Sequence, residues 1–505
     1  EFRDGAGFYT DGRRLAVDEI PTYRSGASCR GEAQFRIEII IRFGASFRPY
    51  IRDMSKQSNK AKRERNPRTS QNATRRDGLA GDSPKRPADR SLASTGLFVL
   101  TAAITITIAE FLRTTWNPFV WLGGGGLWAW YFRRNETENN SPRANSNGFP
   151  YIGLFLVVAT SILLRLGKIN DFPLGPYLDE ILVLAHSLEL SEKPFDLFGH
   201  TPLIRQGWVE TPNLYLYFNL LILKLFGVSY VGMKLFSVIP GVVACAVVLV
   251  IARVLFAPRA ALCLALFFAF AHWPVRLSRY GWDVSFMVMA FSLTVALLLI
   301  ALERRRGLFA YFSGVVAGIG LYSYAASRIC ALSVMVFLII EWLMERERWI
   351  LRQALAFMTG MIIVAVPLFC YYFSNPHSFW VRAGELSVFN SEAPFLAILE
   401  NLWRHALMFH VKGGYYSRDN VPGLTMMDPI TGLIFLVGVL ALCRNGWTRT
   451  SRLLSCIFLL NFVPGIFSVS QEGAPYVYRV AAVMLPAFLI VGFGLQRLLT
   501  KTTTD

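Results

Sequence analysis

Phe172-Pro173-Leu174-Gly175-Pro176-Tyr177-Leu178-Asp179-Glu180 joins an apolar segment, residues 151–167, to a helical pattern that continues to about Leu190. Proline lacks a backbone N–H and restricts the residue before it, so the Pro-Leu-Gly-Pro run ends the apolar helix and fixes the turn. Two adjacent carboxylates, Asp179 and Glu180, are therefore expected within a few residues of a membrane surface. Taken alone, they either favour the positive end of the following helix or serve a chemical function.

The composition predicts a helical membrane protein. Hydrophobic residues make up 53% of the 505-residue chain and charged residues only 17%, whereas about 25% of the residues in soluble domains are charged. Apolar runs of about 18–20 residues recur, which is the length that crosses a hydrocarbon core roughly 30 Å thick as a helix. We therefore expect an all-α polytopic membrane protein rather than a soluble domain.

Twelve transmembrane segments are predicted. Their approximate bounds are 95–112, 116–132, 150–167, 229–252, 261–278, 284–302, 309–325, 328–344, 354–373, 429–443, 453–470 and 480–496. Two further stretches in the long loop 168–228, Ile181–Leu190 and Asn213–Phe226, are helical but short and aromatic, as is typical of helices lying in the membrane interface. Counting residues 212–226 as a span is the alternative, but it would put Arg253 and Arg304 on opposite sides.

Basic residues predict the orientation. Between Met54 and Arg90 there are eleven Lys/Arg and four Asp/Glu. A basic tail can bind nucleic acid, but ahead of membrane spans it more readily marks the cytoplasmic side. Alternate connections are short and basic: Arg133-Arg134, Arg253 with Arg259, Arg304-Arg305-Arg306, Arg346 with Arg348, and Arg444 with Arg449. We expect a cytoplasmic N-terminus and place the long loops 168–228 and 374–428 on the outer face.

The chain divides into three predicted regions. Residues 1–91 form a basic, disordered tail, and within it residues 1–53 are expected to be upstream sequence without a role, because Met54 looks like a natural start. Residues 92–134 form an extra transmembrane hairpin, and residues 150–497 form the main membrane domain. The seven cysteines contain no CxxC pair, which indicates neither a disulfide framework nor a zinc site.

The order of features resembles the GT-C glycosyltransferases that use polyprenyl-phosphate sugars, a group that includes protein O-mannosyltransferases and the lipid A aminoarabinose transferase. Asp179-Glu180 matches the acidic pair in the first outer loop of those enzymes. The segment Thr211–Tyr217 matches their Pro-aromatic stretch, and Asp283, in Ser278-Arg279-Tyr280-Gly281-Trp282-Asp283, matches a second acid at the outer end of a later span. Thr211 stands where the aminoarabinose transferase pattern often has lysine.

A bacterial and archaeal branch of such transferases gives the closest resemblance, over roughly residues 150–497. The similar stretches are Tyr322-Ser323-Tyr324-Ala325-Ala326-Ser327-Arg328, Arg418-Asp419-Asn420-Val421-Pro422-Gly423, Met427-Asp428-Pro429 and Glu472-Gly473-Ala474-Pro475-Tyr476-Val477-Tyr478-Arg479. Each motif alone is weak, but their order and their shared outer-face placement are more specific. The resemblance places the protein in the cell membrane of a bacterium or archaeon.

The resemblance implies transfer of a sugar from a polyprenyl-phosphate donor to an acceptor, which is a protein, a glycolipid or a cell-wall polymer. Such a reaction needs a base near the acceptor and positive charge near the leaving phosphate. Asp179 is assigned as the base, Glu180 as an acid that orients another group or has a structural role, and Asp283 as a group that orients the acceptor or caps a helix. The predicted phosphate and lipid contacts are Arg479, Arg328, Arg279, Arg418, Tyr322 and Tyr324. The alternatives are that Arg328 and Arg479 extend to the membrane interface, as long basic side chains do, and that the two tyrosines pack in the membrane belt. No cofactor is expected, with a divalent metal left open.

Two other classes of function compete with an enzyme. A lipid-linked-sugar carrier or flippase should place ionisable residues in the middle of its spans, and here those regions are predicted to be almost bare, with Glu110 and Glu341 near span ends. A non-catalytic membrane assembly protein on the same fold is the other alternative, because fold does not fix function. The gathering of acids and bases in the outer loops favours the enzyme.

Overall fold

A computed structural model gives the fold. It describes residues 117–134, 151–171, 173, 176–191, 203–206, 209–212, 214–416, 420–470 and 473–501. The predicted tail 1–91, the predicted span 95–112 and Arg418 lie outside the described residues.

The described chain is helical apart from one short antiparallel hairpin, in which Leu203 pairs with Pro212 and Gln206 with Val209. Its elements are α3 (Asn117–Arg134), α4 (Tyr151–Leu166), α5 (Leu178–Ser191), β1 (Leu203–Gln206), β2 (Val209–Pro212), α6 (Leu214–Phe226), α7 (Tyr230–Leu255), α8 (Pro258–Phe270), α9 (His272–Leu277), α10 (Val284–Arg304), α11 (Gly307–Gly320), α12 (Ser327–Glu345), α13 (Arg348–Ser374), α14 (Pro376–Glu385), η1 (Val388–Asn390), α15 (Pro394–Leu407), α16 (Pro429–Arg444), α17 (Arg449–Leu460), α18 (Val463–Ile466), η2 (Ala481–Val483) and α19 (Met484–Lys501).

The predicted all-α membrane class is confirmed. Within the described residues, five helices are long and apolar enough to cross a membrane: Tyr230–Leu255, Val284–Arg304, Ser327–Glu345, Arg348–Ser374 and Ala481–Thr500. Shorter apolar helices are Tyr151–Leu166, Leu214–Phe226, Pro258–Phe270, Gly307–Gly320 and Pro429–Arg444. The total of twelve spans stays a prediction.

Two of the predicted spans are shorter as helices than the apolar pattern suggested. The segment predicted at 261–278 is divided at Ala271, whose ψ of 138° is not helical; α9 restarts at His272 with Pro274 in its first turn, where a missing N–H is tolerated. The segment predicted at 453–470 ends its helix at Leu460, and α18 restarts three residues later with Pro464. Proline thus breaks both apolar runs.

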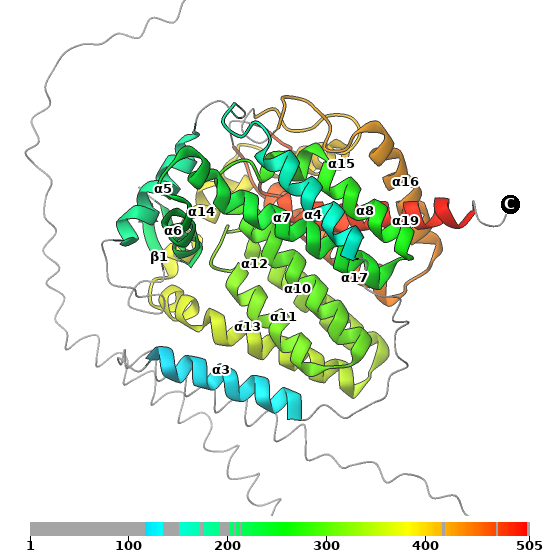
Figure 1. The fold of residues 1–505 in the computed structure, drawn as a ribbon, viewed down its shortest axis with the longest axis horizontal. Helices are drawn as coiled ribbons and strands as arrows, with labels where there is room; N and C mark the ends of the chain where they lie inside the picture. Colours follow the sequence, from blue (N-terminus) through cyan, green and yellow to red (C-terminus); the bar gives the residue numbers. More distant parts are fainter. Residues whose placement is uncertain are drawn as a thin grey trace, which may run out of the picture. The chain divides into compact units, whose positions relative to one another are not determined.

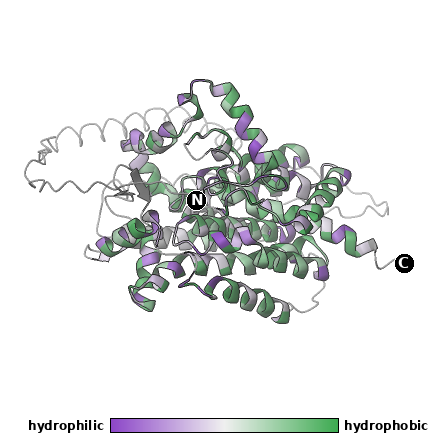
Figure 2. Ribbon diagram, turned by 90° about the horizontal axis from the view of Figure 1, so that it is seen from above, coloured by the Kyte–Doolittle hydropathy of each residue, from purple (hydrophilic) through white to green (hydrophobic). Residues whose placement is uncertain are grey.

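The helices pack side by side in an order that differs from the chain order. α7 contacts α4, α8 and α10, while α10 also contacts α11, and α11 packs along α13. α3 lies against α11 and α13, as Figure 1 shows. Hydrophobic residues dominate these packed helices (Figure 2). α19 contacts α8, α16 and α17 and therefore lies among helices from both halves of the main domain.

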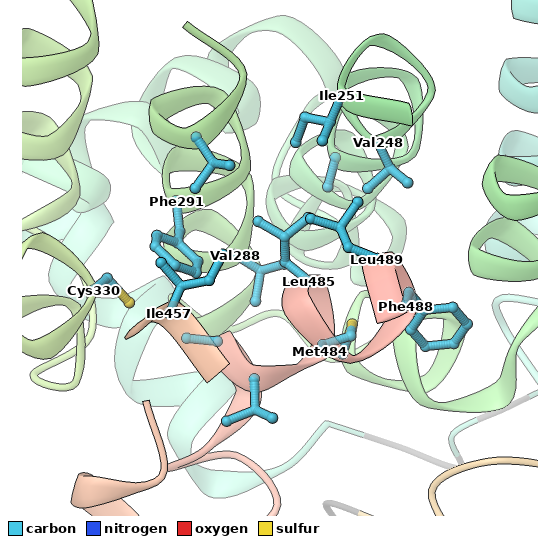
Figure 3. Close-up of a cluster of buried hydrophobic side chains, with 14 of the residues drawn as sticks. Val248, Ile251, Val288, Phe291, Cys330, Ile457, Met484, Leu485, Phe488 and Leu489 are labelled. Carbon is cyan, nitrogen blue, oxygen red and sulfur yellow. The ribbon is translucent and has the colours of Figure 1, made fainter. Parts of the chain in front are cut away.

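The largest core cluster surrounds the beginning of α19. Met484, Leu485, Phe488 and Leu489 are each at most 1% exposed. In Figure 3 they lie among side chains of α7, α10, α12 and α17, including Val248, Val288, Cys330 and Ile457. This packing joins helices far apart in the sequence and holds together the ends that carry the candidate site.

Helices α11 and α13 approach each other through glycines. A Cβ added at Gly314 would lie 1.9 Å from the carbonyl oxygen of Phe357, and one at Gly360 would lie 2.1 Å from that of Tyr311. No side chain fits at those distances, so both positions require glycine. Small residues that let backbones touch are typical of helix contacts in membranes.

Candidate functional site

Glu180 connects three separate parts of the chain. It lies in the first turn of α5, and its carboxylate forms a 2.5 Å salt bridge with Lys234 Nζ from α7. Its Oε2 accepts a 2.8 Å hydrogen bond from the Tyr177 amide, and its Oε1 accepts one from the amide of Gly281. Glu180 is 1% exposed and Lys234 is 0% exposed. These contacts fit the predicted role of Glu180 as an acid that orients another group or stabilises the structure.

The loop before α10 is shaped around this carboxylate. A Cβ on Gly281 would lie 2.7 Å from the Met233 carbonyl oxygen and 3.2 Å from Glu180 Oε1. Ser237 fixes the next residue, because its hydroxyl donates to the Trp282 carbonyl and accepts from the Trp282 amide, both at 2.8 Å. The start of α5 and the end of this loop are thereby held together, which brings Asp179 and Asp283 into one site.

Asp283 and Asp179 interact electrostatically. Asp283 is only 5% exposed, and burial, followed by the negative charge of Asp179, raises its pKa to about 8, although the nearby amides of residues 283 and 284 favour the charged form. Asp179 is half-buried. Two carboxylates that share a poorly solvated site do not both ionise readily. At neutral pH, Asp283 therefore holds a proton and can donate a hydrogen bond.

The helix-capping alternative for Asp283 does not describe its geometry. Asp283 directly precedes α10, but its side chain makes no capping hydrogen bond to that helix. Its Oδ1 is buried and has no hydrogen-bond partner in the described part of the chain. A polar atom left in this state costs free energy unless it serves a ligand or a proton transfer. Asp283 is thus available for chemistry.

A cluster of aromatic rings links the loop that carries Asp283 to the segment that carries Arg479. The ring of Trp282, next to Asp283, lies 5.7 Å from that of Tyr324 and 5.2 Å from that of Tyr478, measured between centroids. The Arg479 guanidinium lies 4.4 Å from the Tyr476 ring centroid, and its Nε donates a 3.2 Å hydrogen bond to the Tyr478 hydroxyl. The rings of Trp282, Tyr324 and Tyr478 therefore join the loop that carries Asp283 to the segment that carries Arg479.

Arg479 is a buried cation that pairs with no acid in the described part of the chain. It is 4% exposed, its Nη1 has no hydrogen-bond partner, and no carboxylate pairs with it among the residues that the structure describes. A buried charge is costly unless a counter-charge reaches it. A bound anion would supply that counter-charge.

A neutral histidine holds the segment that carries Arg479. His405, on α15, lies within 2.7 Å of the Asn401 carbonyl oxygen through Nδ1, and its Nε2 accepts a 3.2 Å hydrogen bond from the Tyr476 amide. Burial lowers the His405 pKa to about 4, and the nearby charge of Arg479 acts in the same direction. The ring is therefore neutral at physiological pH, with the proton on Nδ1.

The other predicted phosphate contacts are engaged elsewhere. Arg279 donates four hydrogen bonds of 2.8–3.1 Å to the carbonyls that end α4, those of Leu164, Arg165, Gly167 and Lys168. Arg328 donates 3.0 Å to the Phe379 carbonyl and 2.9 Å to the Tyr372 hydroxyl. The side chains of Arg279 and Arg328 are thus held by backbone carbonyls and a tyrosine hydroxyl.

The two tyrosines proposed to line a lipid groove or to pack in the membrane belt have different surroundings. Tyr322 is 1% exposed, and its hydroxyl donates a 2.9 Å hydrogen bond to the Val364 carbonyl inside the helix bundle. Tyr324, by contrast, is half-buried beside Trp282. The residues lie in a turn between α11 and α12, where neighbours two apart need not share a face.

Two buried basic residues near the ends of apolar helices were not among the predicted site residues. Lys234 and Arg165 lie within the apolar helices α7 and α4, and both are 0% exposed. Lys234 belongs to the site through Glu180, and sequence reasoning missed it. An isolated lysine in an apolar run was the available signal, because such residues are costly in a membrane and are usually functional or paired.

Part of the sequence matches a known family. Residues 210–372, about a third of the chain, match the family described as Dolichyl-phosphate-mannose-protein mannosyltransferase. The matched segment contains Lys234, Asp283 and Tyr324, whereas Asp179 and Arg479 lie outside it. No curated protein sequence matches the chain.

Solved membrane proteins show limited similarity to the fold. The oligosaccharyltransferase AglB from Archaeoglobus fulgidus, solved with an inhibitory peptide and a dolichol-phosphate, aligns with TM-score 0.45 and 13% identity over 70% of this chain and 50% of its own. ArnT from Cupriavidus metallidurans, bound to undecaprenyl phosphate, gives 0.46 and 17% over 69% and 60%. The arabinosyltransferase EmbB from Mycobacterium smegmatis gives 0.44 and 14% over 76% and 34%.

The chain spans less than two thirds of each of these three proteins. The family match lies on the part of the chain that runs from β2 to α13 and carries one of the two site carboxylates. Together with the long apolar helices, it supports the resemblance predicted from the motifs. Residues 210–372 are thus similar to a family of membrane glycosyltransferases, and the long apolar helices are those of a membrane protein.

Proposed function

We propose that the protein transfers a sugar from a polyprenyl-phosphate donor to an acceptor at the outer face of the membrane. The observation that carries this proposal is the pair of interacting carboxylates Asp179 and Asp283, whose loop packs through the Trp282 ring against Tyr478, the residue before Arg479. Arg479 is buried and has no acidic partner among the described residues. A base on one side of a reacting carbon and a cation on the other is what displacement at an anomeric carbon requires.

Asp179 acts as the general base in this proposal. The acceptor nucleophile loses its proton to the Asp179 carboxylate and forms a bond to the anomeric carbon. The bond from that carbon to the phosphate oxygen breaks, and its electron pair leaves with the polyprenyl phosphate. A positioned base of this kind accelerates a reaction by about 10²–10⁴-fold.

Asp283 and Arg479 have supporting roles in the proposed transfer. Protonated Asp283 leaves a single negative charge on the acidic pair and donates a hydrogen bond that orients Asp179 or the acceptor. Arg479 holds the phosphate as its negative charge grows, and a planar guanidinium suits a phosphate well. Several helices, among them α10 and α12, begin near this site, and the positive ends of their dipoles favour an anion there.

The arrangement of charge supports an enzyme over a carrier. Lys234 lies inside a span, but it is neutralised by Glu180 rather than exposed on a path through the bundle. Asp283 Oδ1 and Arg479 Nη1, two of the buried polar atoms that lack a hydrogen-bond partner in the described part of the chain, lie in the loops that precede α10 and α19, whereas two such nitrogens of Arg165 lie in the last turn of α4.

Asp179→Asn tests the proposal. Purified full-length protein in liposomes is supplied with radiolabelled polyprenyl-phosphate hexoses and pentoses and with a membrane extract as acceptor. We expect wild type to move label into the acceptor and Asp179→Asn to lose at least about 100-fold of that rate, with unchanged expression and melting temperature. Asp171→Asn, at an exposed acid in the turn before α5, is the matched control. Undiminished transfer by Asp179→Asn would refute the mechanism, and movement of intact donor across the membrane without transfer would support a carrier.

A further inference from the structure

Helix α15 presents an unpartnered apolar face. Phe395, Leu396, Leu399, Leu402 and Trp403 are 74%, 64%, 45%, 50% and 64% exposed. At 100° per residue, these five positions fall within an arc of about 120° on one side of the helix. A stripe of this size, with two aromatic rings, is unfavourable in water and marks a contact surface.

The remaining surface of α15 is divided between water and protein. Glu400 and Arg404 form an ion pair next to the apolar arc, and their side chains are 53% and 45% exposed. Asn401 and His405, on the third side, are 5% and 1% exposed. Asn401 Nδ2 donates hydrogen bonds to the carbonyls of Ile466 and Ser468, at 2.9 and 2.8 Å. The helix thus has one apolar, one hydrated and one protein-facing side.

We propose that α15 lies in the membrane interface, with its apolar side in the lipid. Phospholipid, rather than another protein, covers that side of the helix. Three-sided helices of this kind lie in the plane of the interface with the apolar face about 5–10 Å deep in the headgroup and acyl boundary. A tryptophan such as Trp403 is favoured at that depth.

The position of α15 in the chain supports this occupant. It belongs to the connection between α13, which is long and apolar enough to span a membrane, and the apolar helix α16. α16 itself exposes a stripe of apolar residues, Ile430, Leu433, Leu436 and Leu440, at 47–67%. A helix between two membrane-embedded neighbours lies near the lipid boundary, and with 14 residues it is too short to cross a bilayer.

The lipid contact would act on the site through three side chains. Arg404 Nη1 donates a 3.3 Å hydrogen bond to the Ala474 carbonyl, and His405 accepts from the Tyr476 amide. With Asn401, these residues fasten α15 to the segments that lead to Arg479. Lipid that holds α15 therefore sets the height of Arg479 relative to the membrane surface. This consequence rests on the proposed function, whereas the lipid contact itself does not.

Trp403 fluorescence tests the lipid contact without any assay of transfer. Full-length protein is placed in nanodiscs of phosphatidylcholine whose acyl chains carry bromine, and the difference in emission between wild type and Trp403→Phe isolates the signal of Trp403. We expect bromolipid to quench this signal and iodide in the water to leave it largely unaffected. Quenching by iodide alone would overturn the proposal. Protection from both quenchers, with a cross-linked dimer, would overturn it in favour of a second copy of the chain.

A paired variant tests the link from the lipid contact to the site. Leu399→Asp with Trp403→Asp puts charge on the apolar side, while Glu400→Gln changes the hydrated side and serves as the control. We expect faster amide hydrogen exchange over residues 473–479 in the double variant only, with exchange over α10 unchanged. Equal exchange in both variants would show that the lipid contact does not hold this segment. Loss of transfer with unchanged exchange would bear on the proposed function instead.

Discussion

Glu180 and Lys234 form a fully buried salt bridge of 2.5 Å between helices α5 and α7. The Lys234 ammonium also lies 5.0 Å and 5.3 Å from the ring centroids of Tyr230 and Tyr280. An acid and a base 54 positions apart thus determine where α5 begins, and Asp179 is the residue before Glu180. The position of the proposed base depends on this pair.

Removing one member of the pair should destabilise the protein strongly. We expect Glu180→Ala or Lys234→Met to cost about 3–5 kcal/mol of unfolding free energy, because the remaining charge stays buried without a partner. The double variant should lose less than the sum of the two single losses. Thermal unfolding in detergent checks both points, and strictly additive losses would contradict the coupling.

Gly281→Ala should disturb the packing of the loop before α10 against Glu180 and α7. The added Cβ meets the Met233 carbonyl at 2.7 Å and Glu180 Oε1 at 3.2 Å, and overpacking of this kind typically costs about 1–3 kcal/mol. We also expect slower transfer, because the loop that carries Asp283 must shift. Gly384→Ala is the matched control, since nothing lies within 4 Å of a Cβ there. A Gly281→Ala protein with wild-type melting temperature and rate would argue against the tight junction.

The pH dependence of transfer should have an alkaline limit set by Asp283. Its pKa of about 8 means that raising the pH through 8 adds a second negative charge beside Asp179, and we expect the rate to fall there. Asp283→Asn keeps a neutral group, so it should retain more activity than Asp283→Ala and lack the alkaline decline. Transfer rates of wild type and both variants measured from pH 6 to pH 10 test this prediction. If Asp283→Asn shows the same alkaline decline as wild type, the decline belongs to another group.

Stability provides a second measure of the Asp283 proton. Its pKa is higher in the folded protein than the ordinary value of 3.8, so between about pH 4 and pH 8 the native state holds a proton that the unfolded chain has lost. Stability from this group therefore decreases as the pH rises through that interval. We expect the melting temperature of wild type to fall relative to that of Asp283→Asn over this window and the gap to stay constant above pH 8.

Arg479 and Arg328 should respond differently to replacement by lysine. Arg479→Lys should reduce kcat by about 100-fold to 1,000-fold, the usual cost of losing a donor aimed at developing charge. Arg328→Lys should instead lower the melting temperature with a small effect on kcat, because its guanidinium binds the Phe379 carbonyl and the Tyr372 hydroxyl. Steady-state kinetics of both variants with labelled donor compare them, and equal kcat losses would place both arginines on the phosphate.

The helices could be predicted from the sequence because hydrophobic length is a local property. Each predicted span in the described residues corresponds to a helix, and the two short loop helices exist as α5 and α6. The breaks at Ala271 and after Leu460 were harder to predict, since the apolar pattern continues through them. Proline at 274 and 464 was the only local indication.

Contacts between residues far apart in the chain could not be predicted from the sequence. Arg279, Arg328 and Arg479 look alike as basic residues near predicted span ends, yet two of them bind backbone and aromatic groups, and Arg479 alone among the three keeps a buried nitrogen without a partner. Which carbonyl or carboxylate lies opposite a side chain is decided by packing between distant segments. The pairing of Glu180 with Lys234 and the contact of His405 with Tyr476 were unpredictable for the same reason.

The glycine contact between α11 and α13 has a consequence for the lipid donor of the proposed function. At Gly314 and Gly360 the two backbones touch directly, so no acyl chain can pass between these helices and neither can rotate without the other. In the proposed function, the polyprenyl tail of the donor therefore reaches the site between other helices.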